Sequence, residues 1–432
     1  MRAMKDSGIE WIGQIPQTWD VCKIKNCFNV FAGATPKSGN SEFWDGDIVW
    51  VTPADYTTEQ KYVNEGRKCI TQEGFASCST EIIPAGSLVF SKRAPIGLVA
   101  INTVDLCTNQ GCLSCVPFNE NDVEYFYYAL SCFTEQFDLY GSGTTFKEIS
   151  ADAFVNFPIP YPAPETQRKI SEYLRSRCAE IDALIAAKEK TNALLKERRQ
   201  SIIYEAVTKG LNPDAPMKDS GIEWIGQIPK CWDMLRLRFL GAFQNGISKA
   251  GEFFGSGYPF VSYGDVYKNE VLPTVPSGLV ESTESEREQY SVKKGDVFFT
   301  RTSETKEEIG IVAVCKETIP HATFAGFLIR MRPTTDVVST DFLRYYFSCG
   351  LQREYFSKEM TLVTRASLGQ DLLKNMVVTI PSVEEQKAIV NHLDEQTQAI
   401  ESIIANNDFS IQKLKEYRQS IIYEAVTGKI EV

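Results

Sequence analysis

The sequence contains very little histidine and no long apolar run. Only two histidines, His321 and His392, occur among 432 residues. This scarcity argues against a Ser-His-Asp or Cys-His hydrolase and against a histidine-rich metal centre. No apolar run approaches the ~20 residues that cross a bilayer, and residues 1–16 lack the charged-then-apolar pattern of a signal segment. We therefore expect a cytoplasmic protein that does not contact a membrane.

The motifs of the common nucleotide and cofactor sites are also missing. No P-loop pattern occurs, and no GxGxxG sequence follows a predicted strand. The carboxylates are abundant but form no paired or metal-binding spacing. We expect no catalytic residue, no metal and no cofactor in this chain.

Cysteine is plentiful, with 12 residues, and one pair has CxxC spacing. Cys112 and Cys115 could belong to a zinc site, with Cys107 nearby, but such a site needs a second pair and none has matching spacing. The segment 111–116 also reads as a strand, in which positions three apart point to opposite faces. Packed, reduced cysteines are therefore the favoured interpretation.

The net charge is −11, from 45 basic and 56 acidic residues. A free-standing nucleic-acid binder is usually basic. An acidic total does not exclude DNA binding, because the local field decides it. If this chain binds DNA, we expect a partner to supply much of the phosphate contact.

The chain is an internal duplication. Residues 4–20 (MKDSGIEWIGQIPQTWD) match residues 217–233 at 15 of 17 positions, and RQSIIYEAVT occurs at both 199–208 and 418–427. Each copy has the same order: this leader, a globular stretch of about 140 residues, a proline-flanked exit and a long charged helix. The exits are PIPYPAPETQ (158–167) and IPSVEEQ (380–386).

The two long helices should run from about 165 to 207 and from about 384 to 426, each starting after its proline. At about 43 residues, each would be roughly 65 Å long. Positions 174, 181, 188, 195 and 202, and likewise 393, 400, 407, 414 and 421, are seven apart, which is typical of a coiled-coil seam. The predicted seam residues are Leu174, Ile181, Ile185, Leu195, Ile202, Leu393, Ile400, Ile404, Ile411, Leu414 and Ile421.

A helix this long cannot bury its apolar stripe alone, and its duplicate is the nearest partner. A two-fold axis between duplicated units makes such a pair antiparallel. The predicted fold class is α+β: two globular mixed α/β domains, separated by two long antiparallel coiled-coil helices in a pseudo-two-fold tandem repeat. The alternative is a pair of solvated linker helices.

The globular stretches align only loosely. AGSLVFSKR (85–93) and IGLVAI (96–101) correspond to KGDVFFTRT (294–302) and IGIVAV (309–314), and both pairs read as strand, polar-basic turn, strand. An aromatic-rich helix follows in each copy, at 125–128 and 345–346. The connecting segments are thus nearly identical, whereas the globular stretches have diverged.

Binding residues are most plausible in turns that mix basic, hydroxyl and small side chains. Lys and Arg contact phosphates, and Arg, Asn and Ser or Thr can read base edges. Taken alone, any one such turn is more often an ordinary solvated loop. Because Ser or Thr with Arg or Lys recurs after the same strand in both copies, Lys92, Arg93 and Arg301 stand above the rest. The full candidate set is Thr35, Lys37, Ser38, Ser91, Lys92, Arg93, Thr144, Thr145, Lys147, Ser248, Lys249, Tyr263, Arg301, Thr302, Ser303, Thr364 and Arg365.

These segments together resemble the specificity subunit of prokaryotic type I restriction-modification systems. The resemblance rests on the leader, GATPKSGNSEFWDGDIVWVTPAD (33–55), PETQRKI (164–170) and AVTKGLNPDAPMKDSGIEWIG (206–226), and it covers essentially the whole chain. One departure is that the second copy has GISKAGEFFGSGYPF (246–260) in place of the TPxxxNxxFW run. The two domains therefore look like different recognition subtypes.

The resemblance implies target-recognition domains at 1–157 and 211–380, and spacer and docking helices at 158–210 and 381–432. Each domain would read one half of a bipartite, asymmetric target in the major groove of double-stranded DNA. It also implies two modification (methyltransferase) subunits and restriction (translocase and nuclease) subunits as partners. These would carry S-adenosylmethionine, ATP and Mg²⁺, whereas this chain would not be an enzyme. The rival interpretations are a coiled-coil scaffold that does not bind DNA and a single-chain nuclease or methyltransferase with an unrecognised site.

Overall fold

The computed structural model describes residues 2–58, 60–118, 120–142, 147–303, 309–359 and 366–432. The chain divides into two compact units: Met1–Lys188 together with Asp408–Val432, and Glu189–Asn407. Each unit holds one leader, one globular domain and parts of both long helices, which confirms the predicted fold class. The units divide both helices near their middles, whereas the sequence-based boundaries at 157, 210 and 380 separate helices from domains.

The first unit is built on a five-stranded sheet of order β4-β11-β8-β9-β6, with every pair antiparallel except β6–β9. A three-stranded sheet of order β10-β5-β7 lies beside it, and β1–β2 and β3–β12 form two antiparallel pairs. The strands are β1 Met4–Asp6, β2 Gln14–Pro16, β3 Asp20–Lys23, β4 Phe28–Ala32, β5 Trp44–Val51, β6 Tyr62–Val63, β7 Lys68–Ile70, β8 Leu88–Ser91, β9 Val99–Asn102, β10 Cys107–Thr108, β11 Cys112–Pro117 and β12 Pro158–Tyr161.

Both faces of the central sheet are covered, because alternate residues of its inner strands enter different cores. In β8, Leu88 and Phe90 pack into one cluster and Val89 into another. In β11, Cys115 enters the first cluster and Cys112 the second. The prediction of packed cysteines on opposite faces of a strand is confirmed for this pair.

The helices of the first domain are α1 Gln72–Ala76, α2 Val123–Cys132, α3 Thr134–Tyr140 and α4 Ala151–Val155, with 3-10 turns η1 Ile24–Asn26 and η2 Ser41–Phe43. The aromatic helix predicted at 125–128 is α2, whose residues Tyr125 to Leu130 are buried. Asp122 caps α2 by accepting a hydrogen bond from the Tyr125 amide at 2.8 Å. Gln167, on the long helix, in turn accepts a hydrogen bond from the Asp122 amide at 2.9 Å.

The second unit repeats this plan. Its sheets have the orders β16-β23-β19-β21 and β18-β17-β22, with pairs β13–β14, β15–β25 and β20–β24. Its strands are β13 Met217–Asp219, β14 Gln227–Pro229, β15 Asp233–Arg236, β16 Gly241–Asn245, β17 Phe254–Val261, β18 Gly278–Val280, β19 Val297–Thr300, β20 Thr302–Ser303, β21 Val312–Val314, β22 Thr323–Phe324, β23 Leu328–Pro333, β24 Ala366–Ser367 and β25 Val377–Ile380. Its shorter helices are α6 Tyr263–Tyr267, α7 Glu284–Gln289, α8 Thr340–Ser348, α9 Leu351–Glu359 and α10 Gln370–Asn375, with 3-10 turns η3 Leu237–Phe239 and η4 Gly251–Phe253.

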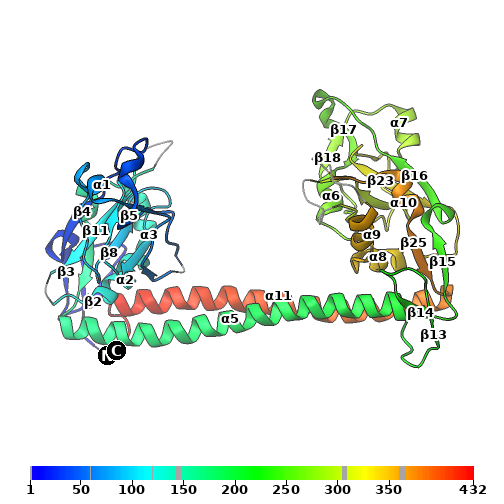
Figure 1. The fold of residues 1–432 in the computed structure, drawn as a ribbon. Helices are drawn as coiled ribbons and strands as arrows, with labels where there is room; N and C mark the ends of the chain where they lie inside the picture. Colours follow the sequence, from blue (N-terminus) through cyan, green and yellow to red (C-terminus); the bar gives the residue numbers. More distant parts are fainter. Residues whose placement is uncertain (1, 59, 119, 143–146, 304–308, 360–365) are drawn as a thin grey trace. The chain divides into compact units, whose positions relative to one another are not determined.

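The two long helices are α5 Pro164–Lys209 and α11 Val383–Val426 (Figure 1). The first begins at Pro164 itself and not after it, because proline is well suited to the first helical position, where its missing N–H is not needed. The entrance to α11 repeats the glutamine contact: Gln386 accepts a hydrogen bond from the Ser339 amide at 2.8 Å, just before α8.

Within each unit the two long helices run antiparallel. In the first unit Arg418 Nε lies 3.1 Å from an oxygen of Asp182, and the cavity that Lys188 lines is also lined by Phe409. In the second unit Asn407 donates to Asn192 at 2.9 Å, and Arg199 Nε lies 3.5 Å from Glu401. Residue numbers rise along α5 as they fall along α11, as the two-fold argument predicted.

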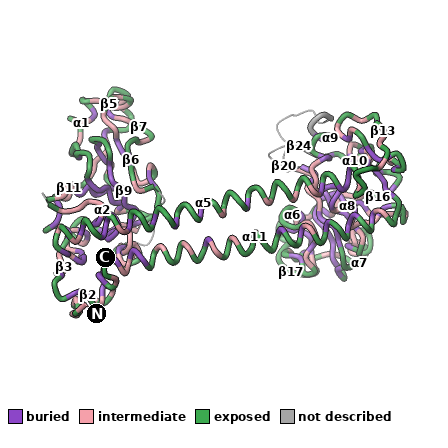
Figure 2. The backbone as a smooth tube through the Cα atoms, turned by 90° about the horizontal axis from the view of Figure 1, so that it is seen from below, coloured by how far each residue is buried: buried purple, intermediate pink, exposed green. Residues whose placement is uncertain are grey.

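The predicted seam residues are buried to different degrees. Figure 2 shows that burial is concentrated in the globular domains, whereas most of the long helices is exposed. Leu174, Ile181, Ile185, Leu393, Ile400, Ile411 and Ile421 are buried, and Leu195, Ile202, Ile404 and Leu414 are half-buried. Near the end of α5 it is Ile203 that is fully buried, beside the half-buried Ile202, because the helix there packs against a globular domain as well as against α11.

The last turn of each long helix contacts a leader. In the first unit Gly428, at φ +70°, stands against Pro16 and Trp19 of the leader, and Tyr125 of α2 donates to the carbonyl of Val426. In the second unit Gly210, at φ +76°, stands against Trp232 in the same way. A Cβ at either glycine would be strained by the positive φ and would crowd the leader. Among the described residues, none of the helices combines the length and hydropathy needed to span a bilayer.

Candidate nucleic-acid interface

Several loops of the first domain meet at one edge of its sheets. We call residues 33–38, 92–98, 109–111 and 147–149 the first loop edge. The Ala34 amide donates to the Thr108 carbonyl, the Lys92 amide to the Gly111 carbonyl and the Ile149 amide to the Lys92 carbonyl, each at 2.9 Å. These backbone bonds join turns that are far apart in sequence, so the edge is a single surface on a rigid support.

Two of the predicted cations at this edge share one carboxylate. Lys92 Nζ and Arg93 Nε each lie 2.8 Å from a different oxygen of Glu148. The hydrogen bond from Lys92 is the largest of the effects that lower the pKa of Glu148, and the bond from Arg93 adds to it. The carboxylate is therefore ionised at neutral pH, holds both cations in place and leaves this cluster with a net charge of one positive unit.

The other candidates of the first domain differ in their accessibility. Lys37 and Ser38 are exposed, and Lys147 is paired with Asp138 at 2.5 Å. Thr35 donates its hydroxyl hydrogen to Oε1 of Gln110. Thr144 and Thr145 lie outside the described residues.

Ser91 requires a correction. Its side chain is fully buried, donates to the Pro95 carbonyl at 2.6 Å and accepts from the Leu98 amide at 2.9 Å. A buried hydroxyl that is already engaged cannot contact DNA, so Ser91 shapes the turn that presents Lys92 and Arg93. Thr300 takes this role in the second unit, where it accepts from the Ile311 amide at 2.9 Å.

The second unit has a corresponding edge made of residues 246–249, 301–303, 325–327 and 366–369, which we call the second loop edge. The Ile247 amide donates to the Phe324 carbonyl and the Arg301 amide to the Phe327 carbonyl, both at 2.9 Å. The Leu368 amide completes the edge by donating to the Arg301 carbonyl at 2.7 Å. The same backbone pattern is therefore built from different side chains.

The cations and hydroxyls of this second edge are arranged differently. Lys249 Nζ lies 2.8 Å from Glu286 and donates to the Glu281 carbonyl at 2.7 Å, and its hydrogen bond is the main cause of the lowered pKa of Glu286. Ser248 is exposed, whereas Arg301 and Thr302 are half-buried. The backbone of Ser303 pairs with β24, and the ring of Tyr263 stacks on Tyr267 with centroids 5.8 Å apart. Thr364 and Arg365 lie outside the described residues.

Sequence reasoning missed three residues of these edges: Glu148, Gln110 and Phe327. Glu148 lies 55 positions beyond Arg93, and Gln110 lies 75 positions beyond Thr35, so no local pattern linked them. Phe327 is 63% exposed directly before β23. The strand–turn–strand segments that match in the two copies, 85–101 and 294–314, contain none of these three residues, so they gave no signal for them.

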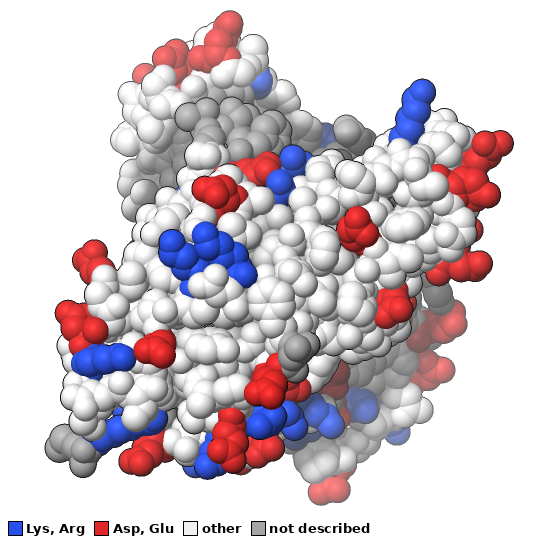
Figure 3. Space-filling model, turned by 90° about the vertical axis from the view of Figure 1, so that its left-hand side faces the viewer, with Lys and Arg blue, Asp and Glu red and all other residues white. Residues whose placement is uncertain are grey.

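One face of the molecule agrees with the acidic composition. Figure 3 shows one face, on which Lys and Arg side chains are dispersed among Asp and Glu and do not form a continuous basic surface. Because phosphate contacts carry most of the affinity of proteins for DNA, such a face would hold DNA weakly by itself.

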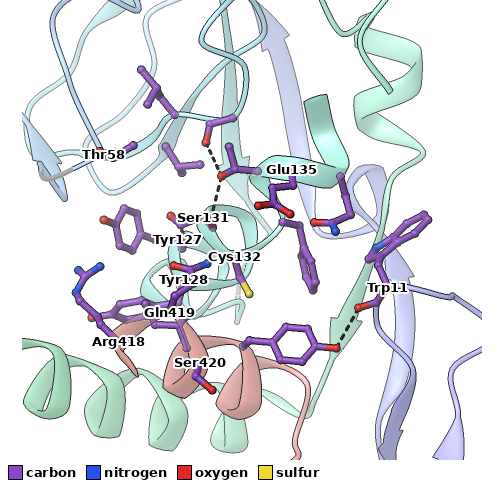
Figure 4. A pocket seen from close by; sticks show the side chains of 18 of the residues that line it. Trp11, Thr58, Tyr127, Tyr128, Ser131, Cys132, Glu135, Arg418, Gln419 and Ser420 are labelled. Carbon is purple, nitrogen blue, oxygen red and sulfur yellow. Dashed lines mark hydrogen bonds between the residues drawn. The ribbon is translucent and has the colours of Figure 1, made fainter. Parts of the chain in front are cut away.

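A cavity of about 690 Å³ in the first unit is lined by α2, α3 and the end of α11, and also by Gly97 and Leu98 of the first loop edge (Figure 4). Tyr423 donates there to the Trp11 carbonyl at 3.1 Å. Burial raises the pKa of the Cys132 thiol to about 12, so this cysteine is protonated at neutral pH and is not a nucleophile. Among the described residues, no group of three or more His, Cys, Asp or Glu could hold a metal ion.

Both copies of the repeat match one protein family, and relatives match over most of the chain. The family model for the type I restriction modification DNA specificity domain matches residues 16–196 and 233–407. The chain is similar to the type I restriction enzyme MjaIX specificity subunit of Methanocaldococcus jannaschii, with 28% identity over 98% of this chain and 95% of that protein. It is also similar to the EcoBI specificity subunit of Escherichia coli, with 23% identity over 81% of this chain and 76% of that protein.

Two solved structures share the fold. A chain from a structural study of complex assembly and conformational transition in the type I R-M system has a TM-score of 0.74 and 17% identity, over 96% of this chain and 99% of that one. The HsdS subunit from Thermoanaerobacter tengcongensis has a TM-score of 0.54 and 17% identity, over 96% and 98% of the two chains. Because the family model covers both copies of the repeat and most of the sequence, this chain belongs to the family of type I restriction-modification DNA specificity subunits.

Proposed function

We propose that this specificity subunit reads a bipartite, asymmetric sequence in double-stranded DNA, with one half-site for each loop edge. The observation that carries the proposal is that the two units place corresponding loops at corresponding edges but fill them with different side chains. Two similar supports with different reading surfaces suit a target whose halves differ. The major groove is the expected site of reading, because all four base-pair orientations are distinguishable there.

The role is recognition and not catalysis, as is known for specificity subunits, and chemistry belongs to partner subunits of the restriction-modification system. In the finer proposal these partners are two modification subunits that use S-adenosylmethionine, and restriction subunits that use ATP and Mg²⁺. The long helices supply the docking surface for the modification subunits. A cytoplasmic location, where these partners and DNA occur together, is part of the proposal.

The helices also set the distance between the half-sites in this proposal. α5 and α11 continue without a break from one compact unit into the other. One heptad inserted after Lys188 in α5, and one at the equivalent position, after Asn407 in α11, should keep the seam in register. We expect the insertion to lengthen the preferred spacer while both half-sites stay the same. Methylation of targets with different spacers tests this. An unchanged spacer preference would refute the proposal that the helices set the distance between the half-sites.

Sequencing of methylated bases in DNA from cells that carry the complete system tests the main proposal. We expect one asymmetric two-part motif with a constant gap. A symmetric or continuous motif would contradict the assignment of one half-site to each unit.

The two rivals predict different results. A scaffold that does not bind DNA predicts that the assembled complex retains random duplexes without sequence preference. A single-chain enzyme predicts turnover by the purified chain supplied with DNA, Mg²⁺, ATP and S-adenosylmethionine. We expect sequence-selective retention by the complex, and turnover only when the partner subunits are present.

A further inference from the structure

We propose that the turn between β10 and β11, with Gln110 at its tip, reads an adenine in the first half-site, and that Phe327 in the equivalent turn of the second unit contacts a thymine methyl group. The inference rests on the proposed function and assigns the reading chemistry within each loop edge.

The first turn is held at both ends. The Asn109 amide donates to the Val51 carbonyl at 3.0 Å, and Asn109 Oδ1 accepts from the Gly111 amide at 2.9 Å. The Cys112 amide closes the turn by donating to the Asn109 carbonyl at 3.0 Å. The side chain of Gln110 projects from this fixed backbone and is exposed, so its position is defined before any ligand binds.

The amide plane of Gln110 is also oriented. Thr35 donates to Oε1, so this oxygen keeps a second lone pair and the amide nitrogen keeps its two hydrogens. In the part of the chain that the structure describes, nothing accepts from that nitrogen. Adenine presents N6–H as a donor and N7 as an acceptor in the major groove, which is the complement of an oriented glutamine amide.

Cationic side chains lie on both sides of this turn. Gly111 accepts from the Lys92 amide, so the Lys92–Arg93–Glu148 cluster adjoins one side. On the other side lies the loop of Thr35, which carries the exposed Lys37. A reading group between cations is the arrangement that places a side chain in the groove while the backbone of the duplex is held.

The backbone contacts align the two turns residue by residue. The Lys92 amide donates to Gly111 in the first unit, and the Arg301 amide donates to Phe327 in the second. The Asn109 amide donates to Val51, and the Ala325 amide donates to Val261. Gln110 therefore corresponds to Gly326, and Gly111 corresponds to Phe327.

The two turns place their side chain at different positions for steric reasons. A Cβ added at Gly326 would come within 2.4 Å of Ser248 Oγ and 3.1 Å of the Ile247 carbonyl oxygen, so a glutamine there would require Ser248 to move. A Cβ at Gly111 would lie 3.1 Å from both Asn109 and Pro53, which leaves little space for a phenylalanine. The second turn instead presents Phe327, 63% exposed, whose ring can contact the thymine methyl group but cannot form hydrogen bonds with base edges.

The test uses the full chain assembled with its modification subunits and a duplex library that is randomised in both half-sites, read out by methylation. We expect the wild-type complex to require adenine at one position of the first half-site. Gln110→Ala should lower that preference by roughly 5- to 140-fold, the factor that corresponds to one bidentate base contact. Gln110→Glu, which can only accept, should shift the preference toward cytosine. Thr35→Val, which removes the orienting bond, should weaken the adenine preference without changing the second half-site.

Phe327→Ala should weaken a thymine preference in the second half-site only. Gln17→Ala and Phe239→Ala are matched controls, because both residues are exposed and lie outside the loop edges; both should leave the profile unchanged. An adenine preference in the first half-site that survives both Gln110 variants would overturn the inference. A wild-type complex without any two-part preference would instead overturn the proposed function.

Discussion

At the first loop edge Glu148 holds Lys92 and Arg93, whereas at the second edge the matching strand residue is Ser367 and the matching turn carries Arg301. Beneath these edges the two units are nearly the same: Trp19 and Trp232 of the leaders are buried, and each long helix ends against a leader. Mutations at the edges change exposed side chains on an unchanged backbone, so they cost little stability. The leaders and the ends of the long helices pack against each other, so a substitution there disturbs a buried contact. This explains why these segments have diverged less than the loop edges.

The largest effect on stability should come from replacing the buried leader tryptophan, and it should be equal in the two units. Trp19 and Trp232 are 2% and 0% exposed. Replacing either by alanine should cost about 3–5 kcal/mol in the free energy of unfolding, because a large cavity is left in a packed core. Denaturant unfolding followed by circular dichroism measures this cost.

The matched control changes the first leader at the two positions where the leaders differ. Gln17→Lys and Thr18→Cys convert the first leader into the second at exposed positions, and the stability change should stay within about 0.5 kcal/mol. If alanine lowers the free energy of unfolding at one of these tryptophans and not at the other, the leaders of the two units are not packed equivalently.

A smaller effect should separate two related ion pairs of the long helices. Arg418 contacts Asp182, whereas Arg199 contacts both Glu401 and Glu270 and is more buried, with 14% against 29% of its side chain exposed. Double-mutant cycles should give about 0.2–1 kcal/mol for Arg418–Asp182. Arg199→Ala should cost more than Arg418→Ala, because it leaves two carboxylates without their cation. Both costs should fall in 1 M salt, and the opposite ranking would contradict this account.

The smallest effect on stability should come from Glu148→Gln at the first loop edge. The lowered pKa of Glu148 means that the ionised carboxylate stabilises the fold above its unfolded pKa of about 4.3. This contribution is lost as pH falls through the lower folded pKa. Wild type should therefore be more stable than Glu148→Gln at pH 7 and equally stable in strong acid, as measured by thermal unfolding across pH.

The same variant should sharpen the difference between the edges in DNA binding. Removing the carboxylate frees Lys92 and Arg93, so binding by the assembled complex should tighten at low salt. The plot of log affinity against log salt concentration should steepen by about 0.9 for each added phosphate contact. Phe239→Ala, at an exposed position outside the second loop edge, provides the control in the second unit and should leave the slope unchanged. Equal slopes for wild type and Glu148→Gln would show that these cations do not reach phosphates.

Much of the candidate site followed from local patterns, and the remainder depended on distant contacts. Lys92, Arg93 and Arg301 were found because the same polar-basic turn follows the same strand in both copies. The burial of Ser91 was not foreseen, because a serine between a strand and a basic pair looks like a surface residue until its two turn hydrogen bonds are known. The partners Glu148 and Gln110 join the edge across 55 and 75 positions, beyond the reach of any periodicity.

The sequence by itself determined the duplication, the two long helices and their antiparallel pairing, because repetition and a seven-residue period act over short stretches of chain. It also indicated that the charge is unsuited to holding DNA without help. Only the tertiary structure decided which turns share an edge, which cations are already paired and which position of each turn can carry a side chain. These features depend on strand order and on steric contacts between segments far apart in the chain, and such contacts exist only once the sheets have formed.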